Sequence, residues 1–216
     1  MHIPLLYPIL DADSLLANAG GSSPMQAVCS HALALADAGC TVLQYRAKQL
    51  NAREALAQAR ELRRLLPGIT LIMNDRADLC LAAAFDGVHV GQDDLSPEGA
   101  RSVLGTEKIV GLSTHNPAQI SEALLQPVNY LAIGPVFDTG SKINPDPAVG
   151  LAGVSEARRL RDESGRPLPL VAIGGITLDN AAEVLRAGAD SVAVIGALSR
   201  SPRESAKEFF RLMVSL

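Results

Sequence analysis

Two aspartates stand just beyond short apolar segments that predict neighbouring β-strands. Asp75 directly follows the segment 70–74, and Asp94 comes shortly after the segment 87–90. Neighbouring strands lie about 5 Å apart, so the two carboxylates could share one hard cation. Mg²⁺ is typically held by one or two carboxylates together with substrate phosphates. The pair therefore predicts a magnesium site, although either aspartate alone is more typical of a solvated loop or a helix N-cap.

Two cations stand at the end of another predicted strand, at 41–46. Arg46 and Lys48 are separated by one residue, so both point to the same side if the strand continues. A cationic pair turned inward needs an anion, because its desolvation is otherwise uncompensated. We expect a phosphate there; a salt bridge to a neighbouring Asp or Glu is the alternative. Lys142, in the long loop 137–150, could close over the same anion.

Bare glycines end the last two predicted strands. Gly174 and Gly175 follow the run of apolar residues near 170, and Gly196 follows a similar run near 191. Glycine lets backbone N–H groups approach a phosphate, and a helix N-terminus adds a favourable dipole. Two such loops predict a second phosphate site, with tight turns alone as the alternative.

His89 and His115 are the candidate general bases. His89 lies inside the apolar segment 87–90, which favours a core or barrel-lining histidine making one hydrogen bond. His115 lies nearer a strand end but adjoins a predicted helix N-cap. Acid–base groups are thus few, while cationic and metal-ligating groups are many. That balance favours departure of a pyrophosphate leaving group over proton abstraction.

Strand-like and helix-like segments alternate along the whole chain. Strands are predicted at 3–10, 41–46, 70–74, 87–90, 108–113, 130–134, 170–174 and 191–196, with helices at 23–38, 52–66, 76–84, 97–104, 117–125, 151–163, 178–187 and 202–214. Eight β-α pairs in one domain, residues 1–216, predict a closed (β/α)8 TIM barrel with its site at the carboxyl ends of the strands. An open doubly wound sheet is the alternative, but no GxGxxG follows the first strand. Pro4 and Pro8 make the first strand the least regular.

The composition limits the class of protein. The chain has 216 residues, of which 48% are hydrophobic, and a net charge of -4. This mild acidity disfavours a nucleic-acid partner. No apolar run reaches about 18 residues and no signal-peptide pattern opens the chain, so we expect a cytoplasmic protein without a membrane partner. Three cysteines without CxxC spacing predict reduced, buried thiols rather than a zinc site.

Six motifs, in order, resemble the thiamine-phosphate synthase (thiamine-phosphate pyrophosphorylase) family. They are Gln44-Tyr45-Arg46-Ala47-Lys48, Asn74-Asp75, Gly91-Gln92-Asp93-Asp94, Gly111-Leu112-Ser113-Thr114-His115, Gly134-Pro135-Val136-Phe137 and Ala172-Ile173-Gly174-Gly175-Ile176. Their order and spacing run through nearly the whole chain. The resemblance implies a TIM-barrel transferase of thiamine biosynthesis that needs Mg²⁺ and acts on small phosphorylated substrates. It is compatible with a homodimer.

The reaction that this resemblance implies joins two halves of thiamine. Pyrophosphate leaves 4-amino-2-methyl-5-pyrimidinylmethyl diphosphate, and the nitrogen of a thiazole phosphate captures the pyrimidine cation. The resemblance implies that Asp75 and Asp94 hold Mg²⁺. The substrate-binding residues it implies are Gln44, Tyr45, Arg46, Ala47, Lys48, Asn74, Ser113 and Lys142 for the pyrimidine diphosphate segment, and Thr139, Gly140, Ser141, Gly175, Ile195 and Gly196 for the thiazole phosphate. Among them, Arg46, Lys48, Ser113 and Lys142 are expected to be catalytic.

The sequence departs from the family pattern in the first strand (6–11), around residues 20–23, and at two positions of the predicted thiazole-phosphate site. Asp138 stands where the family commonly has Pro in a Pro-Thr-x-Thr-Lys loop, which brings a negative charge near phosphate. Gly196 stands where many members have Ser, so one hydroxyl is missing. Both changes concern the thiazole-phosphate half rather than the metal site. The alternatives are a thiazole tautomerase, the paralogous branch in which His115 would be catalytic, and a non-catalytic phosphate-binding regulator.

Overall fold

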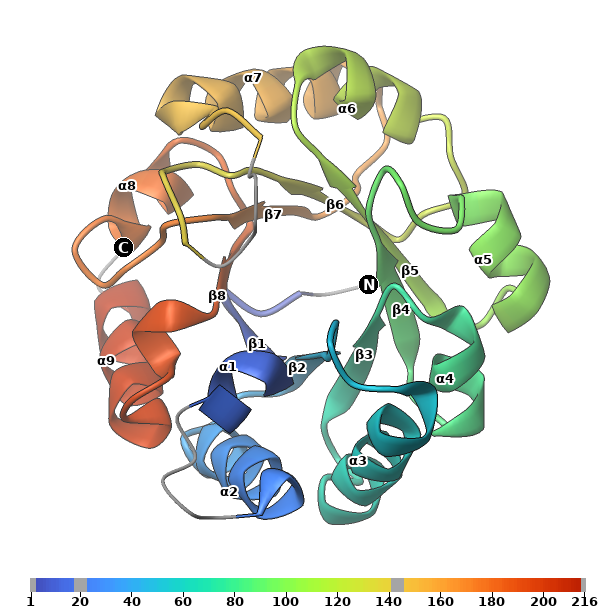
Figure 1. Cartoon of the computed structure of the whole chain (residues 1–216). Coiled ribbons are helices and arrows are strands. Elements are labelled where there is room, and N and C mark those ends of the chain that lie inside the picture. Colours follow the sequence, from blue (N-terminus) through green and yellow to red (C-terminus); the bar gives the residue numbers. More distant parts are fainter. Residues whose placement is uncertain (1–2, 18–22, 141–145, 215–216) are drawn as a thin grey trace.

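Eight parallel strands close into a barrel in the computed structural model, which describes residues 3–17, 23–140 and 146–214. Each strand pairs with the next along the chain, and the last pairs with the first. The strands are β1 (Leu6–Asp11), β2 (Val42–Arg46), β3 (Thr70–Asn74), β4 (Gly87–Val90), β5 (Ile109–Thr114), β6 (Tyr130–Ile133), β7 (Leu170–Ile173) and β8 (Ser191–Val194). Figure 1 looks along this barrel, with the helices outside it. The predicted (β/α)8 class is confirmed.

The helices form the outer layer. They are α1 (Ala12–Ala17), α2 (Pro24–Asp37), α3 (Ala52–Leu65), α4 (Ala77–Ala82), α5 (Pro97–Leu104), α6 (Pro117–Ala123), α7 (Gly150–Glu163), α8 (Ala181–Arg186), the 3-10 turn η1 (Gly196–Leu198) and α9 (Pro202–Val214). Of these, α2, α3, α5 and α6 each begin at a residue whose side chain caps the helix. Ser96 accepts a hydrogen bond from the Gly99 N–H at 3.1 Å, which caps α5. Neither α1 nor η1 is among the predicted helices. No helix in the described ranges is long and apolar enough to cross a membrane.

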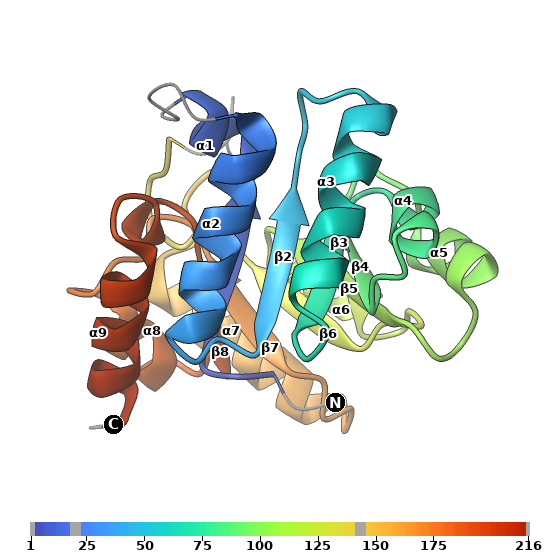
Figure 2. The same ribbon diagram turned by 90° about the horizontal axis from the view of Figure 1, so that it is seen from below.

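The first strand begins later than the sequence predicts. β1 starts at Leu6, so it includes Pro8 but not Pro4. Residues 3–5 run beneath the barrel at the amino ends of the strands, as Figures 1 and 2 both show. Ile3 is buried and packs with the apolar residues of the barrel interior, so this segment closes the lower mouth.

Two apolar layers arise from the alternation of side chains along each strand. Residues turned outward pack under the helices in one large core. Residues turned inward form a second cluster, which contains Tyr7, Tyr130, Ile72 and Val171. The predicted buried thiols are confirmed for Cys40 and Cys80, whereas Cys29 is only partly buried. The interior is therefore filled by packed side chains, and the residues at the carboxyl ends of the strands lie above this packing.

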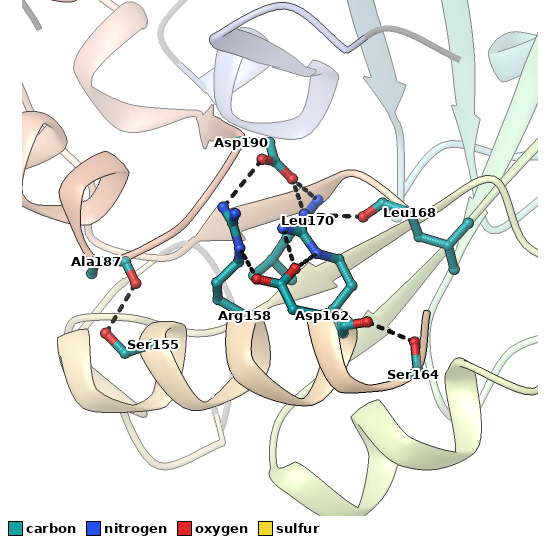
Figure 3. Close-up of polar contacts among 9 residues, drawn as sticks. Ser155, Arg158, Asp162, Ser164, Leu168, Leu170, Ala187 and Asp190 are labelled. Atoms are coloured by element: carbon teal, nitrogen blue, oxygen red, sulfur yellow. Dashed lines mark hydrogen bonds and ion pairs between the residues drawn. The ribbon is translucent and has the colours of Figure 1, made fainter. Parts of the chain in front are cut away.

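An arginine clamp holds the amino ends of β7 and β8 together. The Asp190 carboxylate, just before β8, accepts from the Leu170 N–H at 2.8 Å and from the guanidinium of Arg161 in α7. The Asp190 N–H donates to the Leu170 carbonyl at 2.8 Å. Figure 3 shows Asp190 facing Leu170 and Arg158, above α7. Arg161 is only 7% exposed, so its guanidinium is shielded from water, whereas the Asp190 side chain is partly exposed.

The same clamp occurs at two other strand pairs. At β3 and β4, Asp86 accepts from the Leu71 N–H at 2.7 Å and from Arg63 of α3 at 2.6 Å. At β5 and β6 the acceptor is an amide, because Asn129 accepts from the Val110 N–H at 2.8 Å.

Arg101 of α5 also donates to Asn129, so the third clamp keeps the arginine but replaces the carboxylate by an amide. Every second β-α-β unit from β3 onward thus carries one arginine clamp at the amino end of the barrel. These clamps lie at the opposite end from the predicted site.

Replacing Asp190 with Ala should lower the free energy of unfolding by about 2–3 kcal/mol, because Arg161 and the Leu170 N–H lose their acceptor. Asp190→Asn should cost about 1 kcal/mol, since Asn129 performs this role in the third clamp. Urea unfolding followed by circular dichroism measures both. Asp78→Ala, which removes an exposed partner of Arg76, is the control and should cost little. Equal stability of Asp190→Ala and the native chain would contradict the clamp.

Candidate active site

A cavity of about 1000 Å³ opens at the carboxyl ends of the strands. This size suits a drug-sized ligand or two small ones. The predicted site residues that line it are Gln44, Arg46, Lys48, Asn74, Asp75, Asp94, Ser113, Thr139, Gly140, Gly175, Ile195 and Gly196. Strands and loops from all around the barrel contribute to it, as expected of the upper rim.

Tyr45 and Ala47 do not line the cavity, so the structure does not bring their side chains together with the other predicted substrate-binding residues. Strand alternation turns Tyr45 outward, where its hydroxyl donates to the Gln58 side chain of α3 at 2.8 Å. Ala47 packs against the outer apolar core for the same reason. Ser141 and Lys142 lie outside the described residues.

Asp75 sits at the end of β3 in a strained position. Its φ is 62°, in the left-handed region that few side chains adopt, although Asp tolerates it better than most. The Asp75 N–H donates to the His89 carbonyl at 2.7 Å, which ties the turn to β4. Strain of this kind is typical of functional sites. It holds the carboxylate toward the cavity.

The two predicted metal ligands lie next to each other. Burial raises the pKa of the Asp75 carboxyl; the Lys48 ammonium, at 2.6 Å, lowers it, and the neighbouring Asp94 carboxyl raises it. Asp94 also accepts from the Gly91 N–H at 2.8 Å, which fixes its orientation. Two adjacent carboxylates, one of which raises the pKa of the other, fit a hard divalent cation. No group of three or more metal-ligating side chains occurs in the described part of the chain, so substrate oxygens would have to complete the shell.

Both cations of the second strand are paired with carboxylates, which was the alternative to a phosphate partner. Arg46 donates to the buried Asp11 carboxylate, and Lys48 pairs with Asp75. Asp11 was missed by the sequence analysis, although it is the register partner of Arg46 across β1 and β2. It also accepts from the Ser14 N–H at 2.9 Å, at the start of α1. The Arg46 guanidinium is thereby held in place at the cavity wall.

His89 lines the barrel interior, as predicted, but makes two side-chain hydrogen bonds rather than one. Its Nδ1 lies 2.8 Å from the Tyr130 hydroxyl, and its Nε2 lies 2.8 Å from the Ser113 hydroxyl. Burial lowers the pKa of His89 to about 4, so the ring is uncharged at neutral pH. His115 also borders the cavity; its Nδ1 contacts the Gly134 carbonyl and its Nε2 lies 3.5 Å from the Asp146 carboxylate.

The glycine loops form a separate wall of the cavity. Gly174 and Gly175 have φ angles of 102° and 63°, which glycine adopts without strain. The Asn180 side chain donates to the Gly175 carbonyl at 3.0 Å and accepts from the Thr177 N–H at 2.8 Å, so the turn is fixed. No described residue accepts a hydrogen bond from the backbone N–H of Gly175 or Gly196. These groups are available to an anion.

Comparison with known proteins identifies the family. The family model described as thiamine monophosphate synthase matches residues 15–198. A thiamine-phosphate synthase of Koribacter versatilis is 54% identical over 100% of this chain and 98% of its own length. One of Agrobacterium fabrum is 45% identical over 79% of this chain and 78% of its own length. The chain belongs to the thiamine monophosphate synthase family.

The solved structures agree with this membership. Thiamine phosphate pyrophosphorylase from Pyrococcus furiosus superposes with a TM-score of 0.81 at 27% identity, covering 98% of this chain and 96% of that one. The resemblance drawn from the six motifs is confirmed. Thiamine monophosphate synthases are transferases, so the chain is an enzyme of that class.

The stability of this synthase-family barrel should fall as the pH drops from about 6.5 to about 4. An unfolded histidine has a pKa near 6.5. Burial lowers the pKa of both His31 and His89 to about 4, so between these values the unfolded chain binds more protons. Each such histidine contributes a slope of up to about 1.4 kcal/mol per pH unit.

Unfolding free energies of the native chain and His89→Gln, measured from pH 7 to 4.5, test this. The variant should show a shallower pH dependence, and His31→Gln should behave similarly. Parallel curves for the native chain and both variants would refute the assignment.

Proposed function

We propose that this protein is a thiamine-phosphate synthase, which couples 4-amino-2-methyl-5-pyrimidinylmethyl diphosphate to thiazole phosphate and releases pyrophosphate. The observation that carries the proposal is the division of the cavity. One wall holds Arg46, Lys48 and the two carboxylates, and another is made of glycine backbone. A diphosphate and a monophosphate need these two kinds of wall.

The diphosphate half of the substrate binds at the ends of β2, β3 and β5. Arg46 and Lys48 supply positive charge, and Asn74 and Ser113 supply hydrogen-bond donors. Magnesium, held by Asp75, Asp94 and diphosphate oxygens, would neutralise negative charge on the leaving group. Because Arg46 is already oriented by Asp11, its charge needs little rearrangement when the diphosphate arrives.

The reaction begins with heterolysis of the bond between the pyrimidine methylene carbon and the diphosphate oxygen. The electron pair leaves with pyrophosphate, whose developing charge Arg46 and Lys48 stabilise. The methylene carbon of the resulting pyrimidine cation then accepts the lone pair of the thiazole nitrogen. One C–O bond breaks, one C–N bond forms, and no proton is transferred. An uncharged His89 with both ring nitrogens engaged fits a reaction that needs no general base.

The thiazole phosphate binds at the glycine wall. The N–H groups of Gly175 and Gly196 donate to its phosphate, with Thr139 and Ile195 beside them on the cavity wall. Ser141, which lies outside the described residues, carries a hydroxyl suited to this phosphate, and Lys142 next to it carries a cation suited to the diphosphate. This wall orients the thiazole nitrogen toward the methylene carbon.

Pyrophosphate release should depend on magnesium and on both substrates. The assay supplies aminopyrimidine diphosphate and thiazole phosphate to the native chain and to Asp75→Asn, each with and without Mg²⁺. The variant should lose activity by at least about a hundredfold, because a neutral amide is a poorer ligand for a hard cation. Asp78→Asn, which changes an exposed aspartate of α4 outside the cavity, is the matched control and should retain activity.

Absence of release by verified folded protein, under conditions where a known synthase works, would overturn the proposal. Proton exchange in a thiazole carboxylate phosphate that is lost in His115→Ala would then assign the tautomerase. Binding of both substrates without turnover would assign a regulator.

Gly175→Ala should raise the KM for thiazole phosphate about tenfold while leaving the KM for aminopyrimidine diphosphate within about twofold. An added Cβ would lie 2.7 Å from the Asp138 carbonyl and 2.7 Å from the Phe137 Cβ, so the wall must shift. Gly165→Ala is the matched control: its φ is also positive, at 70°, but no atom lies within 4 Å of the added carbon. Equal changes in both KM values would contradict separate walls.

A further inference from the structure

A chain of hydrogen bonds crosses the interior of the barrel, and its members line the inner part of the cavity. The Gln44 Nε2 donates to the Tyr7 hydroxyl at 3.2 Å, and the Tyr7 and Tyr130 hydroxyls are 2.9 Å apart. The Tyr130 hydroxyl lies 2.8 Å from Nδ1 of His89, whose Nε2 lies 2.8 Å from the Ser113 hydroxyl. Five strands, β2, β1, β6, β4 and β5, each supply one member. We propose that this relay fixes the hydrogen-bonding direction of Gln44 and Ser113, so that Tyr7, Tyr130 and His89 are positioning residues for the pyrimidine substrate.

The Tyr130 ring of the relay fits inside the barrel because Gly111 has no side chain. Gly111 of β5 is the register partner of His89 on one side and of Tyr130 on the other. A Cβ at Gly111 would lie 2.1 Å from the Tyr130 Cζ, so any side chain there would exclude the tyrosine ring. In the space so provided, the His89 and Tyr130 rings stack with centroids 5.4 Å apart and an interplanar angle of 25°.

The surroundings of the relay are apolar. Tyr7 and Tyr130 are at most 2% exposed and pack among Ile9, Ile72 and Val171. A phenylalanine would fill the same space without a hydroxyl that must be satisfied. Burial raises the pKa of both tyrosines, to about 12 for Tyr7, so both remain protonated. When every member of a buried hydrogen-bond relay is paired, each side chain is restricted to one orientation.

The four hydrogen bonds within the relay can all run in one direction, from Gln44 to Ser113. Each hydroxyl has a single hydrogen, so a Tyr7 that accepts from Gln44 donates to Tyr130, and Tyr130 then donates to His89 Nδ1. The remaining imidazole hydrogen, on Nε2, goes to the Ser113 oxygen. The Ser113 hydroxyl hydrogen is left for an acceptor in the cavity. At the other end, the Gln44 amide oxygen has no partner among the described residues and is left to accept.

The relay therefore presents an acceptor at Gln44 and a donor at Ser113. Both residues border the cavity. An aminopyrimidine diphosphate offers the complementary pair, since its amino group donates and its phosphate oxygens accept. This assignment rests on the proposed synthase function. Loss of a relay hydroxyl would free Gln44 or Ser113 to turn, and productive binding of this substrate would weaken.

Tyr130→Phe and Tyr7→Phe test the relay without changing the shape of the ring. Steady-state kinetics are measured with each substrate varied at saturating levels of the other. Either variant should raise the KM for aminopyrimidine diphosphate about tenfold, equivalent to about 1.4 kcal/mol. The KM for thiazole phosphate should stay within about twofold, and kcat should fall less than about threefold.

The double variant Tyr7→Phe/Tyr130→Phe separates a relay from two independent contacts. If the hydroxyls act as one chain, the double variant should raise the KM for aminopyrimidine diphosphate no more than the worse single variant. Tyr45→Phe is the matched control. It also removes a buried tyrosine hydroxyl bond, but on the outer face of β2, away from the cavity. Its KM values should equal those of the native chain.

Three outcomes decide the proposal, with folding of each variant verified by circular dichroism and thermal melting. Folded Tyr7→Phe and Tyr130→Phe with native KM values would overturn the relay while leaving the synthase function standing. Equal increases in the KM of both substrates would also overturn it, because a non-specific distortion of the barrel would weaken the binding of both substrates equally. No pyrophosphate release by the native chain would instead reject the proposed function, and the relay's role with it.

Discussion

Closure of eight parallel strands into one barrel is the constraint on which the rest of this molecule depends. It puts all amino ends of the strands at one rim and all carboxyl ends at the other. The two rims can then differ. The amino rim carries the arginine clamps, in which Asp86, Asn129 and Asp190 tie adjacent strands and an outer helix together. Strain and unpaired groups at the carboxyl rim are tolerable because the strands are fixed elsewhere.

The interior between the two rims contains polar groups as well as packed apolar side chains. Most inward residues are aliphatic, yet Tyr7, Tyr130 and His89 introduce hydroxyl and imidazole groups into this buried interior. Such groups are costly unless every hydrogen is used. The missing side chain at Gly111 makes this pairing possible. A similar logic holds for the charges above: Arg46 is held by Asp11 and Lys48 by Asp75, so the cations are oriented and compensated without a ligand.

Much of this arrangement follows from the sequence alone. Periodicity located the eight strands, and the ends of those strands located Asp75, Asp94 and the glycine wall, because strand ends meet at one rim. The Tyr45 side chain does not reach the cavity although Gln44 and Arg46 do, because alternate residues of a strand face opposite ways. Asp11 and the Tyr7–Tyr130 pair were missed because their partners lie on other strands. Register across a barrel, which joins residues 123 positions apart, is not visible in local patterns.

The departures from the family pattern at Asp138 and Gly196 fall where the structure tolerates them. The glycine wall offers backbone N–H groups, whose position depends on φ angles and on the Asn180 bridge rather than on neighbouring side chains. Gly196 has no atom within 4 Å of a would-be Cβ, so the wall keeps its shape with or without a serine there. Asp138 is exposed, so water screens its carboxylate from a bound phosphate. The proposed phosphate site, because it is built from backbone, can therefore lose a hydroxyl and gain a nearby charge while its geometry stays the same. A site built from side chains, such as the carboxylate pair on the opposite wall, loses its ligand groups when those side chains are substituted.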